Sequence, residues 1–135
     1  MSTIARPWAP HVLIVDDNRH FADSLSRLLE VWNFQPLVAY DGPSAVETAL
    51  TQAPDAILLD IDLPGLDGYA VALRLRCQPG LERTLLVALT GFAREADRQR
   101  SLEAGFDRFL VKPVALEELR RLLAALVCPA EQGAE

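Results

Sequence analysis

Short apolar runs alternate along this chain with longer segments in which hydrophobic residues recur at helical spacing. Runs rich in valine, isoleucine and leucine, bounded by polar residues, are typical of strands buried on both faces of a parallel sheet. The pattern predicts five strands, over residues 11–16, 35–40, 56–60, 85–90 and 108–111. It therefore predicts a parallel sheet whose strands are connected by helices.

Helical periodicity fills the segments after these strands. After the first strand, hydrophobic residues repeat every three or four positions, as on one face of a helix: Phe21, Leu25, Leu28, Leu29 and Trp32. The five helices are predicted over residues 19–33, from about 42 onward, and over 68–77, 94–104 and 116–127. Alternating strands and helices with right-handed crossovers predict an α/β fold, a doubly wound five-stranded parallel sheet flanked by five helices.

The composition of the chain excludes several classes of protein. The 135 residues suffice for one domain with its own core, and the net charge of −6 argues against general nucleic-acid binding. No apolar run reaches the roughly 20 residues of a membrane span, and the first ten residues lack the apolar core of a secretory signal. Cys77 and Cys128 lack the spacing of metal ligands. We expect a cytoplasmic protein that binds neither membrane nor nucleic acid.

Polar residues stand where the predicted strands end. Asp16 and Asp17 close the first strand, Asp60 the third, Thr90 the fourth and Lys112 the fifth. Lys112 is also the only lysine of the chain. The carboxyl ends of parallel strands meet at one edge of the sheet, where ligands bind in folds of this class. The pattern therefore predicts one site that contains three carboxylates, a hydroxyl and an ammonium group.

The residue types of this predicted site favour phosphoryl chemistry. Three neighbouring carboxylates repel one another unless they share protons or hold a cation, and oxygen ligands suit Mg²⁺. The Thr90 hydroxyl and the Lys112 ammonium are suited to binding phosphoryl oxygens. Asp60 is the candidate nucleophile, which would become an aspartyl phosphate.

Four segments carry a resemblance to a known family. They are residues 12–18 (VLIVDDN), 58–68 (LLDIDLPGLDG), 88–91 (ALTG) and 104–113 (AGFDRFLVKP). In this order they look like the motifs of the receiver domain of two-component response regulators. The resemblance implies a flavodoxin-like (βα)5 fold with strand order 2-1-3-4-5.

The resemblance also suggests a domain organisation. It covers residues 11–127 as the receiver domain, and we expect residues 1–10 to be a flexible arm and 128–135 a flexible tail. So short a tail would leave a stand-alone receiver without an output domain. The sequence of residues 104–113 resembles that of receiver domains in hybrid histidine kinases. This similarity favours a role in a phosphorelay.

The resemblance assigns roles to the strand-end residues. It implies that Asp60 accepts a phosphoryl group from a histidine kinase or a histidine phosphotransfer protein of a bacterial pathway. It implies that Mg²⁺ is bound by Asp16, Asp17, Asp60 and the backbone carbonyl of Asp62. Thr90 and Lys112 would contact the phosphoryl oxygens. No other cofactor is implied, and the protein would be a signalling domain rather than an enzyme with turnover.

The resemblance also implies a switch. Thr90 and Phe109 occupy its switch positions, and the peptide bond between Lys112 and Pro113 is expected to be cis. Phosphorylation would alter the face formed by the last two helices and the last strand, which a downstream protein would recognise. The helix predicted over 94–104 has little apolar surface, so we expect packing to hold it weakly. We expect a monomer or a weak dimer.

An alternative from the enzyme class is a phosphatase of the haloacid-dehalogenase type. Asp60 and Asp62 resemble the DxD motif of that family, in which the first Asp is the nucleophile and the second an acid/base. In that family the motif follows the first strand, whereas here an Asp-Asp pair comes first. The order of the motifs argues against the phosphatase.

Overall fold

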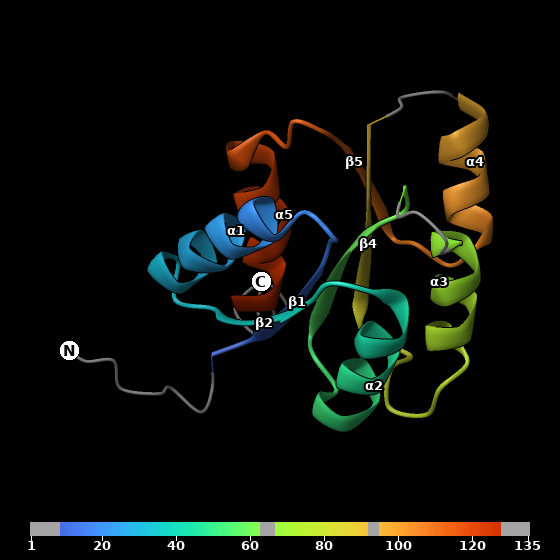
Figure 1. Cartoon of the computed structure of the whole chain (residues 1–135), viewed down its shortest axis with the longest axis horizontal. Helices are drawn as coiled ribbons and strands as arrows, with labels where there is room; N and C mark the ends of the chain where they lie inside the picture. The colour runs from blue at the N-terminus through green and yellow to red at the C-terminus, as the bar shows by residue number, and fades with distance from the viewer. Residues whose placement is uncertain (1–8, 63–66, 92–94, 128–135) are drawn as a thin grey trace, which may run out of the picture.

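Five parallel strands form a single sheet in a computed structural model that describes residues 9–62, 67–91 and 95–127. The strands are β1 (His11–Val15), β2 (Gln35–Ala39), β3 (Ala56–Asp60), β4 (Leu85–Thr90) and β5 (Arg108–Val111). Their order across the sheet is β2-β1-β3-β4-β5 (Figure 1). This arrangement confirms the predicted doubly wound fold and its strand order.

Helices cover both faces of the sheet. They are α1 (Arg19–Val31), α2 (Gly42–Gln52), α3 (Gly68–Arg76), α4 (Glu95–Glu103) and α5 (Leu116–Val127). In Figure 1, α1 and α5 lie on one side of the sheet and α2, α3 and α4 on the other. Each side has its own cluster of buried residues, with α1 and α5 contributing to one and α2 and α3 to the other. The central strands β1 and β3 are therefore buried on both faces, as their continuous apolar sequences predicted.

The predicted boundaries differ from the observed ones by one or two residues. The first helix was predicted to reach residue 33, but α1 ends at Val31. Asn33 has φ of 72°, in the left-handed region, and the N–H of Phe34 donates to the carbonyl of Leu29 at 2.9 Å. This turn closes the helix earlier than its hydrophobic spacing indicated.

The two described residues before the first strand contact the rest of the domain. Ala9 is buried, and the carbonyl of Pro10 accepts a hydrogen bond from the N–H of Gln35 at 2.8 Å. We had assigned both residues to the arm over 1–10. Residues 1–8 and the predicted tail over 128–135 lie outside the described residues. Within the described ranges no helix is both long and apolar enough to cross a bilayer.

One arginine joins the loops at the edge of the sheet opposite the strand-end acids. Arg76 ends α3, and its guanidinium donates to backbone carbonyls and to a carboxylate: Leu81 (3.3 Å), Glu82 (3.1 Å), Thr84 (2.9 Å), Gly105 (2.8 Å) and Asp107 (3.0 Å). Asp107 also accepts from the N–H of Leu86 at 2.9 Å. The guanidinium thus joins the loop after α3 to the loop before β5 and supplies hydrogen bonds to partly buried loop carbonyls such as those of Thr84 and Gly105.

We expect Arg76→Gln to lower the free energy of unfolding by about 2 kcal/mol, because hydrogen bonds to a charged donor are lost and several carbonyls lose their partner. Urea unfolding followed by circular dichroism measures the change. Arg83→Gln, at an exposed position in the loop before β4, is the matched control and should change stability by less than about 0.5 kcal/mol. Equal stability of the two variants would contradict the role given to Arg76.

Candidate phosphoryl and metal site

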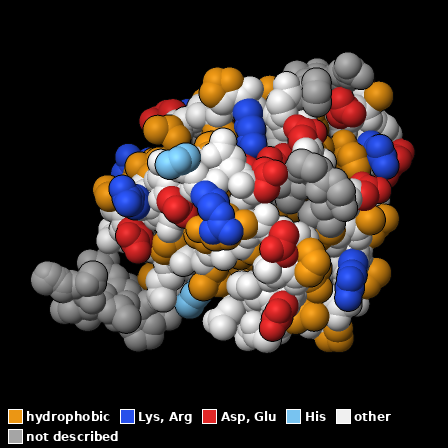
Figure 2. Space-filling view, in the orientation of Figure 1, with side chains coloured by type: hydrophobic (Ala, Val, Ile, Leu, Met, Phe, Trp, Pro, Cys, Tyr) orange, Lys and Arg blue, Asp and Glu red, His pale blue; other side chains and the backbone are white. Residues whose placement is uncertain are grey.

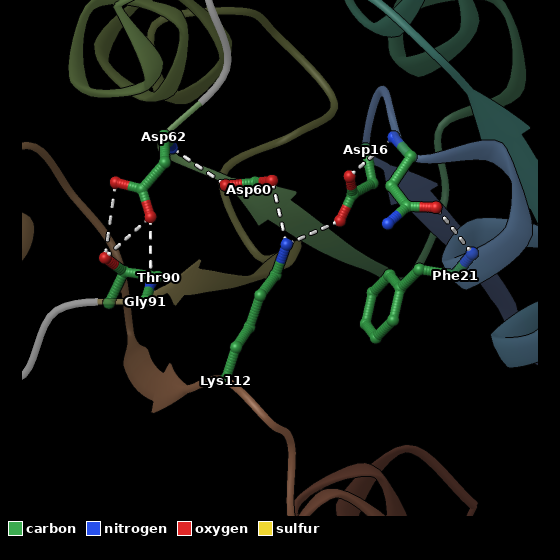
Figure 3. A network of polar contacts seen from close by, with 8 residues as sticks. Asp16, Phe21, Asp60, Asp62, Thr90, Gly91 and Lys112 are labelled. Carbon is green, nitrogen blue, oxygen red and sulfur yellow. Dashed lines mark hydrogen bonds and ion pairs between the residues drawn. The ribbon is translucent and has the colours of Figure 1, made fainter.

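The predicted strand-end residues come from four strands and meet at one edge of the sheet (Figure 3). Asp60 and Thr90 are the last residues of β3 and β4, and Asp16 and Lys112 directly follow β1 and β5. The strand register places Asp60 beside Leu89 and Thr90 beside Val111, so the neighbouring strands end together. The parallel topology thus brings residues almost a hundred positions apart into contact.

Lys112 lies between two buried carboxylates. Its Nζ is 2.8 Å from Oδ2 of Asp16 and 2.9 Å from Oδ2 of Asp60. The Asp16 and Asp60 side chains are only 1% and 7% exposed, whereas that of Lys112 is 27% exposed. Buried carboxylates require a compensating charge, and this ammonium supplies it from the solvent side. The ring of Phe21 lies 4.9 Å from the same Nζ and adds a cation–π contact.

Backbone hydrogen bonds orient both carboxylates. Oδ1 of Asp16 accepts from the N–H of Asn18 at 2.9 Å, and Oδ1 of Asp60 accepts from the N–H of Asp62 at 2.8 Å. Each carboxylate therefore has one oxygen fixed by the backbone and the other facing Lys112. This arrangement holds the nucleophile candidate in one orientation.

The pKa values of Asp60 and Lys112 depend on the burial of each group and on the contact between them. Burial raises the pKa of the Asp60 carboxyl above its ordinary value, and the hydrogen bond from Lys112 opposes that rise. Burial alone would lower the pKa of Lys112, but its hydrogen bonds to Asp16 and Asp60 raise it above the ordinary value. The ammonium is therefore retained at neutral pH, where it offsets part of the negative charge of the neighbouring carboxylates.

Three carboxylates form a cluster that could hold a cation. Asp16, Asp17 and Asp60 each place one oxygen within 4.8 Å of the others. Asp17 is exposed, so the cluster opens to solvent on its side. Oxygen-only donors with an open side suit Mg²⁺, which binds few protein carboxylates and keeps several waters.

The Thr90 side chain contacts Asp62, and the Thr90 carbonyl accepts a hydrogen bond from the N–H of Lys112 at 2.7 Å. The Thr90 hydroxyl donates to the Asp62 carboxylate, at 3.0 Å from Oδ2 and 3.3 Å from Oδ1. The N–H of Gly91 donates to the same Oδ2 at 2.8 Å. The receiver resemblance uses the backbone carbonyl of Asp62 and the phosphatase alternative its acid/base chemistry, but neither predicted that its carboxylate binds Thr90 and Gly91. The position of Asp62 two residues after Asp60 was the available signal, but the direction of a loop side chain cannot be inferred from spacing.

Phe109 shares a face of the sheet with Thr90. Phe109 pairs with Ala88, and Thr90 pairs with Val111, so the two side chains lie diagonally on neighbouring strands. Phe109 is half-buried against the cluster on the α2–α4 side, and the guanidinium of Arg98 lies 5.1 Å from its ring centroid. The peptide bond between Lys112 and Pro113 is cis, the geometry that the resemblance implies.

The comparison with known families agrees with these observations. The model named "Response regulator receiver domain" matches residues 12–124. The transcriptional regulatory protein PrrA of Mycobacterium tuberculosis is 40% identical over 119 residues, which are 88% of this chain and 50% of PrrA. The response regulator MprA of Mycobacterium ulcerans is 40% identical over 116 residues, 86% of this chain and 49% of MprA. The chain thus spans about half the length of these relatives.

Solved structures show the same fold. The receiver domain of the sensor histidine kinase PA1611 from Pseudomonas aeruginosa, with a magnesium ion in its active site cleft, superposes with a TM-score of 0.79 and 34% identity. That alignment covers 88% of this chain and 98% of the PA1611 chain. The chemotaxis response regulator CheY4 of Vibrio cholerae has a TM-score of 0.81 and 26% identity, over 87% of this chain and 98% of CheY4.

The contacts of Lys112 predict how it titrates. Because it is the only lysine, isotope labelling of lysine Nζ gives one side-chain NMR signal, and we expect a pKa above the ordinary value of 10.5. Stabilisation from its ion pairs is complete below that ordinary value and is lost as pH rises through the higher pKa of the folded protein. Asp60→Asn should lower the pKa of Lys112, because one ion pair becomes a hydrogen bond to a neutral group.

Asp55→Asn provides the matched control for this titration. Asp55 precedes β3 at the opposite edge of the sheet, where it accepts from the N–H of His11, so its loss should leave the Lys112 signal unchanged. A pKa at or below the ordinary value in the unmodified protein would show that the two ion pairs do not form in solution.

Proposed function

Since the chain belongs to the family of response regulator receiver domains, we propose that Asp60 is the phosphoacceptor of a two-component or phosphorelay pathway. The observation that carries this proposal is the setting of its carboxylate. It is buried at the end of the central strand β3, oriented by the N–H of Asp62 and neutralised by Lys112. The donor would be a phosphohistidine of a histidine kinase or of a histidine phosphotransfer protein.

The proposed reaction moves one phosphoryl group. A carboxylate oxygen of Asp60 attacks the phosphorus, the new O–P bond forms as the P–N bond of the donor histidine breaks, and the imidazole leaves with the electron pair of that bond. The ammonium of Lys112, which contacts Asp60 already, would then contact the transferred phosphoryl oxygens. We also assign the Thr90 hydroxyl to these oxygens, which requires it to leave Asp62.

We assign Mg²⁺ to the carboxylates of Asp16, Asp17 and Asp60 and to the backbone carbonyl of Asp62. The proximity of the three carboxylates and the magnesium in the related PA1611 receiver domain support this assignment. When bound, the ion would neutralise phosphoryl oxygens that the acidic cluster alone would repel.

The chemical test uses acetyl phosphate as a small donor. In the presence of Mg²⁺ we expect the intact mass of the protein to increase by one phosphoryl group, with acetate released. Chelation of Mg²⁺ by EDTA should abolish the adduct, because the acids would repel the incoming phosphate. Asp60→Asn should form none, whereas Asp55→Asn should react like the unmodified protein. An adduct on the Asp60→Asn variant would place the phosphoryl group elsewhere.

The phosphatase hypothesis has no support in these comparisons. Its two acids would be Asp60 and Asp62, but the carboxylate that would act as the acid/base, that of Asp62, is bound to Thr90 and Gly91. We therefore assign the chain a signalling role, in which Asp60 is modified and only slowly restored, and not a role in turnover of small phosphoesters.

We place the output on the face formed by α4, β5 and α5. Among the described residues of α4 only Ser101 is buried, so few apolar contacts hold this helix. Arg98 of α4 contacts the ring of Phe109 on β5, which shares a sheet face with Thr90. Movement of Thr90 toward a phosphoryl group would therefore change the space available to Phe109, and through Arg98 the position of α4.

Hydrogen exchange tests this switch. Addition of beryllofluoride with Mg²⁺, which mimics the phosphoryl group, should change amide exchange in α4 and β5 of the unmodified protein, because α4 is weakly packed. Phe109→Ala should still bind beryllofluoride but should lose the exchange change in α4. If that variant and the unmodified protein show the same change in α4, Phe109 does not transmit the signal.

A downstream protein that recognises this face is the proposed partner, in a cytoplasmic pathway and with the chain as a monomer or weak dimer. The net charge of −6 gives no basis for a nucleic-acid partner of these residues. The relatives named as transcriptional regulators are about twice as long as the matched region, so their output is not assigned to this chain.

A further inference from the structure

The Asp62 carboxylate accepts hydrogen bonds from the Thr90 hydroxyl and the Gly91 N–H at the end of β4. We propose that Asp62 is a positioning residue that holds the Thr90 hydroxyl and the Gly91 N–H in the resting protein, and that a phosphoryl group on Asp60 must displace it. The proposal rests on the function assigned to Asp60. It makes Asp62 an internal competitor that sets how readily the site accepts a phosphoryl group.

The geometry of the contacts supports this competition. A single oxygen of Asp62, Oδ2, accepts from Gly91 at 2.8 Å and from Thr90 at 3.0 Å. The backbone N–H of the same residue donates to Oδ1 of Asp60 at 2.8 Å, so the two carboxylates are attached to one short backbone segment (Figure 3). Asp60 pairs with Leu89, the residue before Thr90, so the donors held by Asp62 lie at the end of the strand next to that of the proposed phosphoacceptor.

The Asp62 carboxylate has the same hydrogen-bonding character as a phosphoryl group on Asp60. An ionised carboxylate offers only acceptor oxygens, as a phosphoryl group does, and both bind hydroxyl and N–H donors through charge-assisted hydrogen bonds. A phosphoryl group on Asp60 would also bring negative charge close to Asp62. The resting contacts and this repulsion both oppose phosphorylation.

Thr90 is buried and Asp62 is exposed, so the Asp62 carboxylate can be displaced from its contact with the Thr90 hydroxyl. Thr90 is 1% exposed, whereas Asp62 is an exposed residue. The donor is thus fixed in the protein, but the acceptor can turn into water, where its charge is solvated at little cost. Figure 2 shows acidic and basic side chains interspersed on the face in view, without a continuous basic patch. No nearby cation is required to receive Asp62 when it turns outward.

The experiment measures the affinity of beryllofluoride in the presence of Mg²⁺ by fluorine NMR. Asp62→Ala should bind about tenfold more tightly than the unmodified protein, as expected when one hydrogen bond to a charged group need not be broken. Asp62→Asn keeps the size and an acceptor oxygen but loses the charge, so its affinity should lie between the two. Both variants retain the backbone carbonyl assigned to the metal.

A double-mutant cycle separates displacement from simple charge repulsion. If Asp62 acts through the Thr90 hydroxyl, the gain from Asp62→Ala should shrink in a Thr90→Val background. Repulsion between Asp62 and the bound anion would give the same gain in both backgrounds, and that result would overturn the proposal.

Amide exchange of Gly91 tests the resting contact without any ligand. With neither Mg²⁺ nor beryllofluoride present, exchange at Gly91 should be faster in Asp62→Ala than in the unmodified protein, and intermediate in Asp62→Asn. Unchanged exchange would overturn the proposal.

The outcomes also separate this proposal from the function on which it rests. If the unmodified protein binds beryllofluoride but the Asp62 variants bind it no more tightly, the role of Asp62 is refuted and that of Asp60 stands. If the unmodified protein binds none and takes no phosphoryl group from acetyl phosphate, both are refuted.

Discussion

The ammonium of Lys112 is the charge on which this edge of the molecule depends. It contacts Asp16 and Asp60, which are 96 and 52 positions away in the chain, and so joins the ends of β1, β3 and β5. Without a cation between them, two nearly buried carboxylates would repel each other or take up protons. A lysine suits this position because its compact ammonium can donate to two separate acids, whereas a planar guanidinium favours one carboxylate at a time. The Lys112 ammonium therefore both joins the strand ends and holds the carboxylates of Asp16 and Asp60 in place.

Much of this site could be predicted because it depends on topology. Asp16, Asp60 and Lys112 each follow an apolar run, and the ends of parallel strands meet whatever the details of the loops. The strand ranges and the doubly wound sheet followed from the same alternation of strands and helices, whereas the strand order came from the family resemblance. Such features depend on hydrophobic period, which the sequence displays directly.

What could not be predicted depends on side chains that leave the regular elements. The carboxylate of Asp62 contacts Thr90 from a position beyond the end of β3, where no periodicity describes the direction of a side chain. Arg76 contacts carbonyls from two separate loops, and its position at the end of a helix does not predict this role. The early end of α1 depends on the φ of Asn33, which hydrophobic spacing does not detect.

The helix α4 was expected to be weakly held, and the structure shows what replaces apolar packing. Arg100 lies 4.2 Å from the ring centroid of Tyr69, and Arg98 lies over Phe109. Tyr69 in turn meets Phe106 edge to face, with 6.5 Å between the ring centroids. Arginine–aromatic contacts of this kind contribute less than a buried apolar face, and solvent reaches them readily. The helix is thus held by side-chain contacts at the surface rather than by a buried apolar face.

The two hydrophobic clusters on either side of the sheet share no residue. Side chains on one side can consequently be replaced over evolutionary time without repacking the other, because contacts across the sheet pass only through backbone. A lineage could therefore retain the α1–α5 side while the α2–α4 side diversified, or the reverse. The sheet separates two hydrophobic layers, and the acids and the lysine at its edge belong to neither of them.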